Sequence, residues 1–359
     1  MNGIKTMGWG ALPLIAILLS GAPGAECGQP GTPNTTADPP DERNAPAAST
    51  TSATDSGAWP YPFFGFNTKG RLDPEVQTRF ANAFFDQITA PSIKSNLVVR
   101  VTGGTISQTT AGSDWTPAVI KDWTDLQKRQ GIRYIYVVNG NDSPADQAAA
   151  IQRWLDAGAH FDFLEMMNEY YLPKFAKGDR TKDEVTRQVT PEIYVNEILP
   201  AFWKELDRFH LPYYLIFAPE KGEGGTDNRL AEWNNVVAKA TREKWPERDL
   251  NATVHLYAHG SIGNYDYGQI DRLRQSLPAA RHIAVTEAGV LDPGMTFQEN
   301  GQAAVQHYRS ILQHLGRGDY LLDQVLYNPG KRNNISALDS HGETAKGRII
   351  LQFIQNRLK

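Results

Sequence analysis

The sequence predicts an α/β fold of the (β/α)8 or TIM barrel class, and two observations support it. Between residues 59 and 359, eight short apolar segments alternate with eight amphipathic segments along the chain. This alternation is typical of a parallel sheet whose strands are joined by helical crossovers. The expected domain also has roughly 300 residues, a length that suits one barrel with a single hydrophobic core.

The expected strands are short runs rich in apolar, β-branched and aromatic residues. They are Phe63–Asn67, Leu97–Thr102, Tyr134–Asn139, Phe161–Met167, Tyr213–Phe217, Thr253–Tyr257, His282–Thr286 and Leu321–Tyr327. The expected helices are Pro74–Ile88, Pro117–Gln130, Pro144–Ala157, Pro191–Phe209, Asn228–Trp245, Ile270–Leu277, Gly301–Leu315 and Glu343–Leu358. Each strand is therefore followed by one helix, as a barrel requires.

Several of the expected helices begin with proline shortly after Thr, Asp or Ser. Thr116 can accept a hydrogen bond from the first turn, and Pro117 loses none because the first helical N–H groups have no partner within the helix. A doubly wound open sheet is the alternative fold. Its usual sign is the turn G-x-G-x-x-G after the first strand, and residues 65–70 do not fit that pattern, so the barrel is favoured.

The N-terminal part of the chain is expected to lie outside the barrel. Residues 1–26 read as a secretory signal, because a lysine precedes a short apolar run, Ala11–Leu19, that is followed by small residues. The run is too short to cross a membrane in the mature chain. Residues 27–58 are rich in Pro, Thr, Ser, Ala and Gly, which predicts a solvated linker, with the barrel domain in residues 59–359.

Cys27 is the sole cysteine of the chain, so no disulfide framework is expected. Its place just after the apolar run fits an acylated lipoprotein cysteine, whereas Glu26 departs from the small residue that such signals carry before it. Both a freely secreted chain and one with a lipid anchor at Cys27 stay open. In either case the expected location is outside the cytoplasm: secreted, periplasmic or at the cell surface.

The charge balance argues against nucleic acid as a partner. The chain carries 36 Lys and Arg against 40 Asp and Glu, a net charge of −4, whereas duplex binding usually needs a basic face.

His255 and His259 have the spacing of zinc ligands on a helix, but they lie in a strand and the loop after it. We therefore expect neither a metal nor an organic cofactor.

Two glutamates stand at the ends of expected strands far apart in the sequence. Glu169 follows the fourth strand, and Glu287 follows the seventh. In a parallel barrel all strands end at one face, so these two side chains can converge there. Two facing carboxyl groups in different surroundings are what hydrolysis of a glycosidic bond requires. Met166 and Tyr170 give Glu169 an apolar setting that favours its protonated form.

The chain resembles clan A glycoside hydrolases, the retaining (β/α)8 glycosidases, in Asn168-Glu169 at the fourth strand and Thr286-Glu287 at the seventh. The resemblance implies that Glu169 is the acid/base and Glu287 the nucleophile. It also implies that Asn168 binds the sugar 2-hydroxyl, and that His255 or Tyr257 at the sixth strand contacts the nucleophile or the sugar. A structural role in the lumen is an equal alternative for His255.

The second strand ends in Arg100-Val-Thr-Gly-Gly, which resembles the heparanase/β-glucuronidase and arabinofuranosidase/xylosidase families of that clan. There the arginine supports the nucleophile, although one extra residue separates Arg100 from the glycines here, and a turn with a salt bridge is the alternative. Asn67 at the first strand and Tyr327 at the eighth complete the expected substrate-binding set. Tyr327 would stand where the clan carries a tryptophan beneath the sugar.

The sequence thus predicts a secreted retaining glycoside hydrolase that takes a polysaccharide or oligosaccharide as its substrate. A catalytically silent carbohydrate-binding barrel on the cell surface is the first alternative. Another secreted barrel hydrolase, such as a metal-dependent esterase or deacetylase, is the second, but the strand ends do not offer the His/Asp set that it would need.

Overall fold

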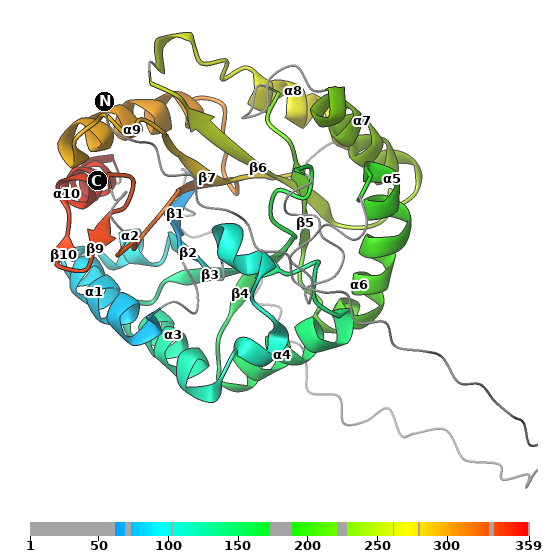
Figure 1. Ribbon diagram of the computed structural model, residues 1–359, viewed down its shortest axis with the longest axis horizontal. Coiled ribbons are helices and arrows are strands. Elements are labelled where there is room, and N and C mark those ends of the chain that lie inside the picture. Colours follow the sequence, from blue (N-terminus) through cyan, green and yellow to red (C-terminus); the bar gives the residue numbers. More distant parts are fainter. Residues whose placement is uncertain are drawn as a thin grey trace, which may run out of the picture. The chain divides into compact units, whose positions relative to one another are not determined.

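A computed structural model shows a closed barrel of eight parallel strands in chain order, β1 to β8 (Figure 1). It describes residues 62–68, 73–101, 103–172, 189–220, 228–260, 262–278, 281–329 and 334–357. The strands are β1 Phe63–Asn67, β2 Leu97–Val101, β3 Arg133–Val138, β4 Phe161–Met166, β5 Tyr213–Phe217, β6 Leu250–Ala258, β7 Ile283–Val290 and β8 Tyr320–Asp323. The predicted (β/α)8 barrel is therefore confirmed.

The barrel closes where its first strand pairs with its last. Phe63 of β1 lies opposite Tyr320 of β8, while Asn67 at the other end of β1 lies opposite Arg100 of β2. Gly65 brings β1 close to β2 on its other side, because a Cβ at that position would overlap the carbonyl oxygen of Val98. Only glycine allows the backbones of β1 and β2 to approach so closely at this point.

The helices form a ring around the barrel, as Figure 1 shows. They are α1 Pro74–Asp86, α2 Pro91–Lys94, α3 Pro117–Gln130, α4 Pro144–Asp156, α5 Pro191–Ile193, α6 Leu199–Leu206, α7 Asn228–Glu243, α8 Gln269–Ser276, α9 Phe297–Ile311 and α10 Ala345–Arg357. The cap predicted before α3 is present, since the Thr116 hydroxyl accepts a hydrogen bond from the Val119 N–H at 3.4 Å.

Two of the expected helices differ most from the prediction. The helix expected over residues 191–209 is divided into α5, a π-helical turn over Tyr194–Ile198, and α6. Pro200 explains the division, because it has no N–H to donate to the turn before it. Helix α9 begins four residues earlier than expected, at a capping box in which Thr296 and Glu299 exchange hydrogen bonds.

The N-terminal halves of the strands fill the lumen with apolar side chains. This lower lumen layer consists of Val98, Ile135, Phe163, Tyr214, Ala284, Tyr320 and Leu322. The rings of Phe163 and Tyr214 stack with centroids 3.7 Å apart, and Tyr320 meets Phe163 edge to face. The barrel is therefore closed at its base by packed side chains.

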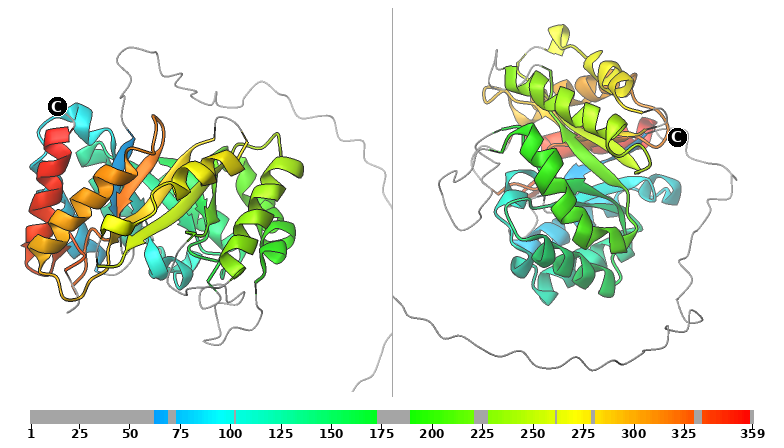
Figure 2. Two further views of the ribbon diagram at one scale, coloured as in Figure 1. Left: turned by 90° about the horizontal axis from the view of Figure 1, so that it is seen from above. Right: turned by 90° about the vertical axis from the view of Figure 1, so that its right-hand side faces the viewer.

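Helices α9 and α10 pack side by side against the outside of the β7, β8 and β1 region (Figure 2). Between them and the barrel, the buried Lys346 ammonium lies 2.8 Å from the Asp323 carboxylate of β8. The Tyr308 hydroxyl of α9 donates to the same carboxylate. This buried ion pair ties the last helix to the last strand.

The expected signal over residues 1–26, the linker over residues 27–58 and the lipid attachment site Cys27 lie outside the described residues. In the part of the chain that the structure does describe, every helix is too short or too polar to traverse a bilayer.

Candidate active site

The upper lumen layer is built around a buried guanidinium. The Arg100 side chain has no exposed surface, and all five of its N–H groups have acceptors. Its Nε and Nη2 donate to Glu165 at 2.6 and 2.9 Å, and its Nη1 donates to Glu287 Oε1 at 2.5 Å. Burial opposes the charge of Arg100, but the two carboxylates outweigh burial and raise its pKa above the usual value.

The remaining two donors of Arg100 bring the predicted asparagines into the same cluster. Nη1 donates to Asn67 Oδ1 at 3.1 Å, and Nη2 donates to Asn168 Oδ1 at 2.8 Å. The structure thus gathers Asn67, Arg100, Asn168 and Glu287 around one cation. Of the two interpretations of Arg100, support of the strand-seven glutamate is the one that the geometry favours.

Glu165 is the fixed counter-charge of this layer. It is fully buried on β4 and accepts hydrogen bonds from the hydroxyls of Thr253 at 3.1 Å and Thr286 at 2.9 Å. Burial acts to raise the pKa of Glu165, but the Arg100 charge, the contact with His255 and the Arg100 hydrogen bonds together lower it to about 2. Glu165 is therefore ionised at neutral pH, and it has no route to solvent.

Glu287 reaches the lumen through a β-bulge. It lies within β7, three residues before Val290, and does not end the strand as the sequence suggested. Val254 of β6 pairs with Val285 and His255 with Glu287, so Thr286 is the extra residue. A bulge lets two consecutive side chains turn toward the same face. Thr286 thus reaches Glu165 while Glu287 reaches Arg100.

Glu169 reaches the site through a left-handed turn. Strand β4 ends at Met166, and both Met167 (φ 70°) and Glu169 (φ 46°) adopt backbone conformations that cost non-glycine residues energy. Gly140 leaves room for this turn, because a Cβ there would stand 2.5 Å from Met167 Cγ and from the Tyr170 hydroxyl. The turn directs the Glu169 carboxyl toward His255.

His255 connects the carboxyl groups of the layer. Its Nδ1 lies 3.1 Å from Glu169 Oε1, while its Nε2 lies 3.8 Å from Glu165 and 3.9 Å from Glu287. The longer distances are ionic contacts without a hydrogen bond. Burial acts to lower the pKa of His255, but the charge of Glu287 and the contacts with Glu165 and Glu169 raise it to about 9.

Two tyrosine hydroxyls face the two candidate catalytic groups. Tyr257 of the sixth strand donates to Glu287 Oε2. Tyr171 donates to Glu169 Oε1 at 3.4 Å, a contact that the sequence did not single out. Burial raises the pKa of both tyrosines well above the usual value, and neighbouring carboxylates add to the rise. Both hydroxyls therefore remain donors at neutral pH.

The Gly-Gly run after β2 lies beside Glu287. Gly104 has φ 64°, a left-handed conformation that favours glycine, and a Cβ there would be 3.6 Å from Glu287 Oε1. Gln108, four residues later, donates to the backbone oxygen of Asn168. This segment therefore lines the site between Glu287 and Asn168.

Tyr327 is not placed with the other predicted residues. Strand β8 ends four residues earlier, at Asp323, and the Tyr327 ring stacks on Phe80 of α1 with centroids 6.4 Å apart. The residue at the mouth end of β8 is Gln324, which the sequence did not mark. Counting alternate residues from Tyr320 in the lumen would have found it.

The catalytic candidates are the members of the cluster that reach solvent. The side chains of Glu169 and Glu287 are 16% and 9% exposed, whereas those of Arg100, Glu165 and His255 are fully buried. A ligand entering from the strand ends would thus meet two carboxyl groups, each held by a tyrosine.

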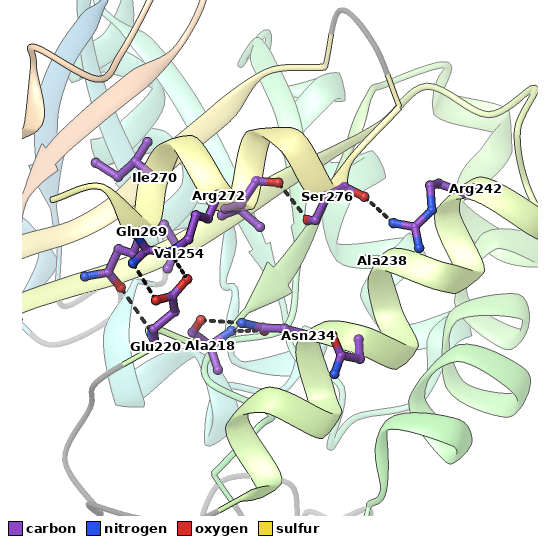
Figure 3. A pocket seen from close by; sticks show the side chains of 12 residues that line it. Ala218, Glu220, Asn234, Ala238, Arg242, Val254, Gln269, Ile270, Arg272 and Ser276 are labelled. Carbon is purple, nitrogen blue, oxygen red and sulfur yellow. Dashed lines mark hydrogen bonds and ion pairs between the residues drawn. The ribbon is translucent and has the colours of Figure 1, made fainter. Parts of the chain in front are cut away.

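A cavity of about 300 Å³ lies outside the barrel between α7 and α8 (Figure 3). Its charged groups bind one another, since Arg272 donates to Glu220 at 2.8 and 2.6 Å, and Arg242 donates to the Ser276 carbonyl. It contains neither Glu169 nor Glu287, so it is separate from the lumen cluster.

No protein-family model matches the sequence, and no curated protein matches it. Solved structures do share its fold. A family 39 glycoside hydrolase from Bacteroides cellulosilyticus aligns with a TM-score of 0.53 and 12% identity over 82% of this chain. A 4-O-α-L-rhamnosyl-β-D-glucuronidase from Fusarium oxysporum aligns at 0.54 and 9% over 82%, and a family 39 enzyme from Xanthomonas axonopodis at 0.50 and 13% over 80%.

The chain spans 64%, 69% and 65% of these three proteins, respectively. At identities this low, the likeness concerns the arrangement of strands and helices and leaves the chemistry to be argued from the site. The expected resemblance to clan A is thus met at the level of architecture: the chain has the (β/α)8 barrel fold of these glycoside hydrolases.

Proposed function

We propose that this protein is a retaining glycoside hydrolase with Glu287 as nucleophile and Glu169 as acid/base. The observation that carries the proposal is the pairing of these two carboxyl groups across His255, with Arg100 bound to only one of them. A double displacement needs one ionised and one protonated carboxyl group at the scissile bond. Arg100 and Tyr257 bind Glu287, whereas His255 and Tyr171 contact Glu169.

Counting charges in the cluster supports the same assignment. Three carboxyl groups, Glu165, Glu169 and Glu287, share the lumen with the two cations Arg100 and His255. The cluster is neutral when one carboxyl group keeps its proton. Glu169 is the one of the three that Arg100 does not contact, and for this reason we assign it the acid/base role.

The reaction then follows from the positions of the groups. Glu287 attacks the anomeric carbon while Glu169 gives its proton to the leaving oxygen, and a glycosyl-enzyme forms. Glu169 next takes a proton from water, which attacks the anomeric carbon and releases Glu287. Arg100 and Tyr257 stabilise the carboxylate that leaves. Asn168 Nδ2 has no hydrogen-bond partner in the described residues, and in this proposal it donates to a sugar hydroxyl.

The proposed substrate is an O-linked polysaccharide or oligosaccharide, cleaved outside the cytoplasm. Its support is the presence of carbohydrate-active enzymes among the proteins of the same fold, together with the signal-like segment over residues 1–26. Mass spectrometry of the protein from its native host tests the location. Cleavage before residue 28 supports export, and an acyl mass on Cys27 supports a lipid anchor.

The decisive experiment measures hydrolysis of a panel of polysaccharides and aryl glycosides by the wild type, Glu169→Ala and Glu287→Ala. Each variant should lose roughly 10⁴-fold or more in kcat. Azide should restore turnover in both and give glycosyl azides of opposite anomeric configuration. Glu220→Ala is the matched control, since Glu220 also follows a strand but is 43% exposed and bound to Arg272. It should retain activity.

Other outcomes would reject the assignment. If the wild type cleaves a glycan and neither glutamate variant is impaired, the carboxyl pair is not the catalytic one. If the wild type binds glycans by calorimetry but cleaves none, the non-catalytic carbohydrate-binding barrel replaces the hydrolase.

A further inference from the structure

Gln324 lies at the mouth of the barrel and faces its lumen. Along β8, Tyr320 and Leu322 belong to the lower lumen layer, whereas Asp323 points outward to Lys346. The alternation of a strand places Gln324 on the lumen side, one step above Leu322. On the neighbouring strand β7, Ala288, which directly follows Glu287, pairs with Asp323.

The space for this side chain is provided by Gly289. Gly289 follows Glu287 by two residues and pairs with Tyr257 across β6 and β7. A Cβ on Gly289 would overlap Gln324 Oε1, so glycine is required for the amide to lie there. The Gln324 backbone is fixed as well, because its N–H donates to Ala288 O and its carbonyl accepts from Asn67 Nδ2, both at 3.0 Å.

The amide of Gln324 is buried but unused by the protein. The residue is 2% exposed, and neither Oε1 nor Nε2 has a hydrogen-bond partner among the described residues. Gln127 of α3 shows the ordinary arrangement: it is 5% exposed, and its amide donates to His160 O and accepts from His160 N. A buried amide that lacks partners opposes folding, so its presence calls for a ligand that supplies them.

We propose that Gln324 is a specificity-determining residue that hydrogen-bonds adjacent hydroxyl groups of the sugar bound at Glu287. A carboxamide offers one acceptor and two donors in a plane, which suits two neighbouring hydroxyl groups that each donate and accept. Its backbone is joined to the nucleophile through Asn67 and Arg100, so the amide has a fixed position relative to the anomeric carbon. This inference rests on the proposed glycosidase function.

The test compares the wild type with Gln324→Met, an apolar substitution of similar shape, and with Gln127→Met as the matched control. The substrates are p-nitrophenyl β-glycosides of glucose, galactose, mannose, xylose and glucuronic acid, with deoxy analogues of whichever is cleaved best. For Gln324→Met we expect at least a tenfold fall in kcat/KM on the best glycoside. The ratio of kcat/KM on this glycoside to kcat/KM on its epimer should fall tenfold in Gln324→Met. The wild type and Gln324→Met should cleave one of the deoxy analogues equally well.

Thermal unfolding separates this role from a structural one. The Tm of Gln324→Met should equal or exceed that of the wild type, because no internal hydrogen bond is lost. Gln127→Met should lower Tm and leave the sugar preference unchanged. Gln324→Asn keeps the amide on a side chain that is one methylene shorter. This variant should fold, and its sugar preference should change less than that of Gln324→Met.

Three results would overturn the inference. A Tm for Gln324→Met that falls as far as that of Gln127→Met would make the amide structural. A sugar preference within twofold of wild type in both Gln324 variants would remove its role in recognition. If the wild type cleaves nothing, calorimetry with methyl glycosides separates the two proposals. Binding that is tenfold weaker in Gln324→Met than in the wild type would reject the hydrolase proposal and keep the role of Gln324. Absence of binding to the wild type would reject both.

Discussion

The lower and upper halves of the barrel lumen use the same strands but opposite chemistry. On β2 the inward residue changes from Val98 to Arg100 over one repeat, and on β4 it changes from Phe163 to Glu165. The lower layer is apolar and packed, and the upper layer is ionic. Packing below excludes water from beneath the charges, which strengthens each ionic contact above. The comparison indicates that the lower half stabilises the fold, whereas the upper half positions charged groups at some cost in folding free energy.

Arg100→Met should have the largest effect, because it removes the cation that both Glu165 and Glu287 require. Leaving buried carboxylates without their partner costs about 3–5 kcal/mol in unfolding free energy. Loss of support for the nucleophile should also lower kcat by roughly 10³-fold. Urea unfolding and steady-state kinetics measure the two effects.

The double variant Arg100→Met/Glu165→Gln is the control. Its unfolding free energy should partly recover, and its kcat should not. A single variant as stable as wild type would contradict the ionic core.

Phe163→Ala should affect stability alone. It removes the ring that stacks on Tyr214 and meets Tyr320, and the cavity costs about 3 kcal/mol. In the protein that remains folded, kcat should stay within about threefold of wild type, since the reactive groups are held by hydrogen bonds in the upper layer. A loss of kcat as large as that of Arg100→Met would contradict the claim that the lower layer affects stability alone.

His255 gives the upper layer a dependence on pH that the lower layer lacks. Its pKa is raised from 6.5 to about 9 in the folded protein, so the folded state binds its proton more tightly. The resulting stability is fully present below pH 6.5 and is lost as pH rises to 9, on the order of 3 kcal/mol. Urea unfolding from pH 6 to 9.5 should show this loss in wild type. In His255→Gln the loss should be absent, and an unchanged slope in that variant would rule out His255 as its source.

Tyr171→Phe should give the smallest change. It removes one hydrogen bond of 3.4 Å to Glu169, worth about 1 kcal/mol, and so should reduce kcat roughly fivefold. Tyr170→Phe is the control, because the Tyr170 hydroxyl donates to Asn141 at 2.6 Å instead. That variant should lose stability while kcat stays unchanged. Equal kinetic effects in the two variants would show that Tyr171 has no special relation to the acid/base.

The sequence predicted the elements of the barrel better than the details of its mouth. Strands β1 and β5 and helix α3 have the predicted bounds, because apolar periodicity, proline and capping residues act locally. Glu169 and Glu287 were predicted as a pair from strand order, and they do share one site. The bulge at Thr286 and the left-handed turn at Met167 leave no such periodic signal. The directions of the Glu287 and Glu169 side chains could therefore not be predicted from the sequence.

The eighth strand shows the same limit in another way. Its apolar run continues beyond Asp323, and the sequence therefore extended the strand to Tyr327. The chain instead leaves the barrel to form the short hairpin of β9 Leu338–Asp339 and β10 Gly342–Glu343, and Tyr327 pairs with Leu338. Such packing between distant segments decides where the strand ends, and hydrophobic pattern alone does not contain it.

The seam between β1 and β8 also has a consequence for the order in which the protein assembles. Phe63 meets Tyr320 only after nearly the whole domain has been made, so β1 waits with an unpaired edge while the rest of the chain emerges. Contacts between residues so distant in sequence form slowly. Arg100 and Glu165 can meet early, but Glu287 joins them late. A partly synthesised chain therefore holds the arginine and its counter-charge without Glu287, and the cluster is complete only when the ring has closed.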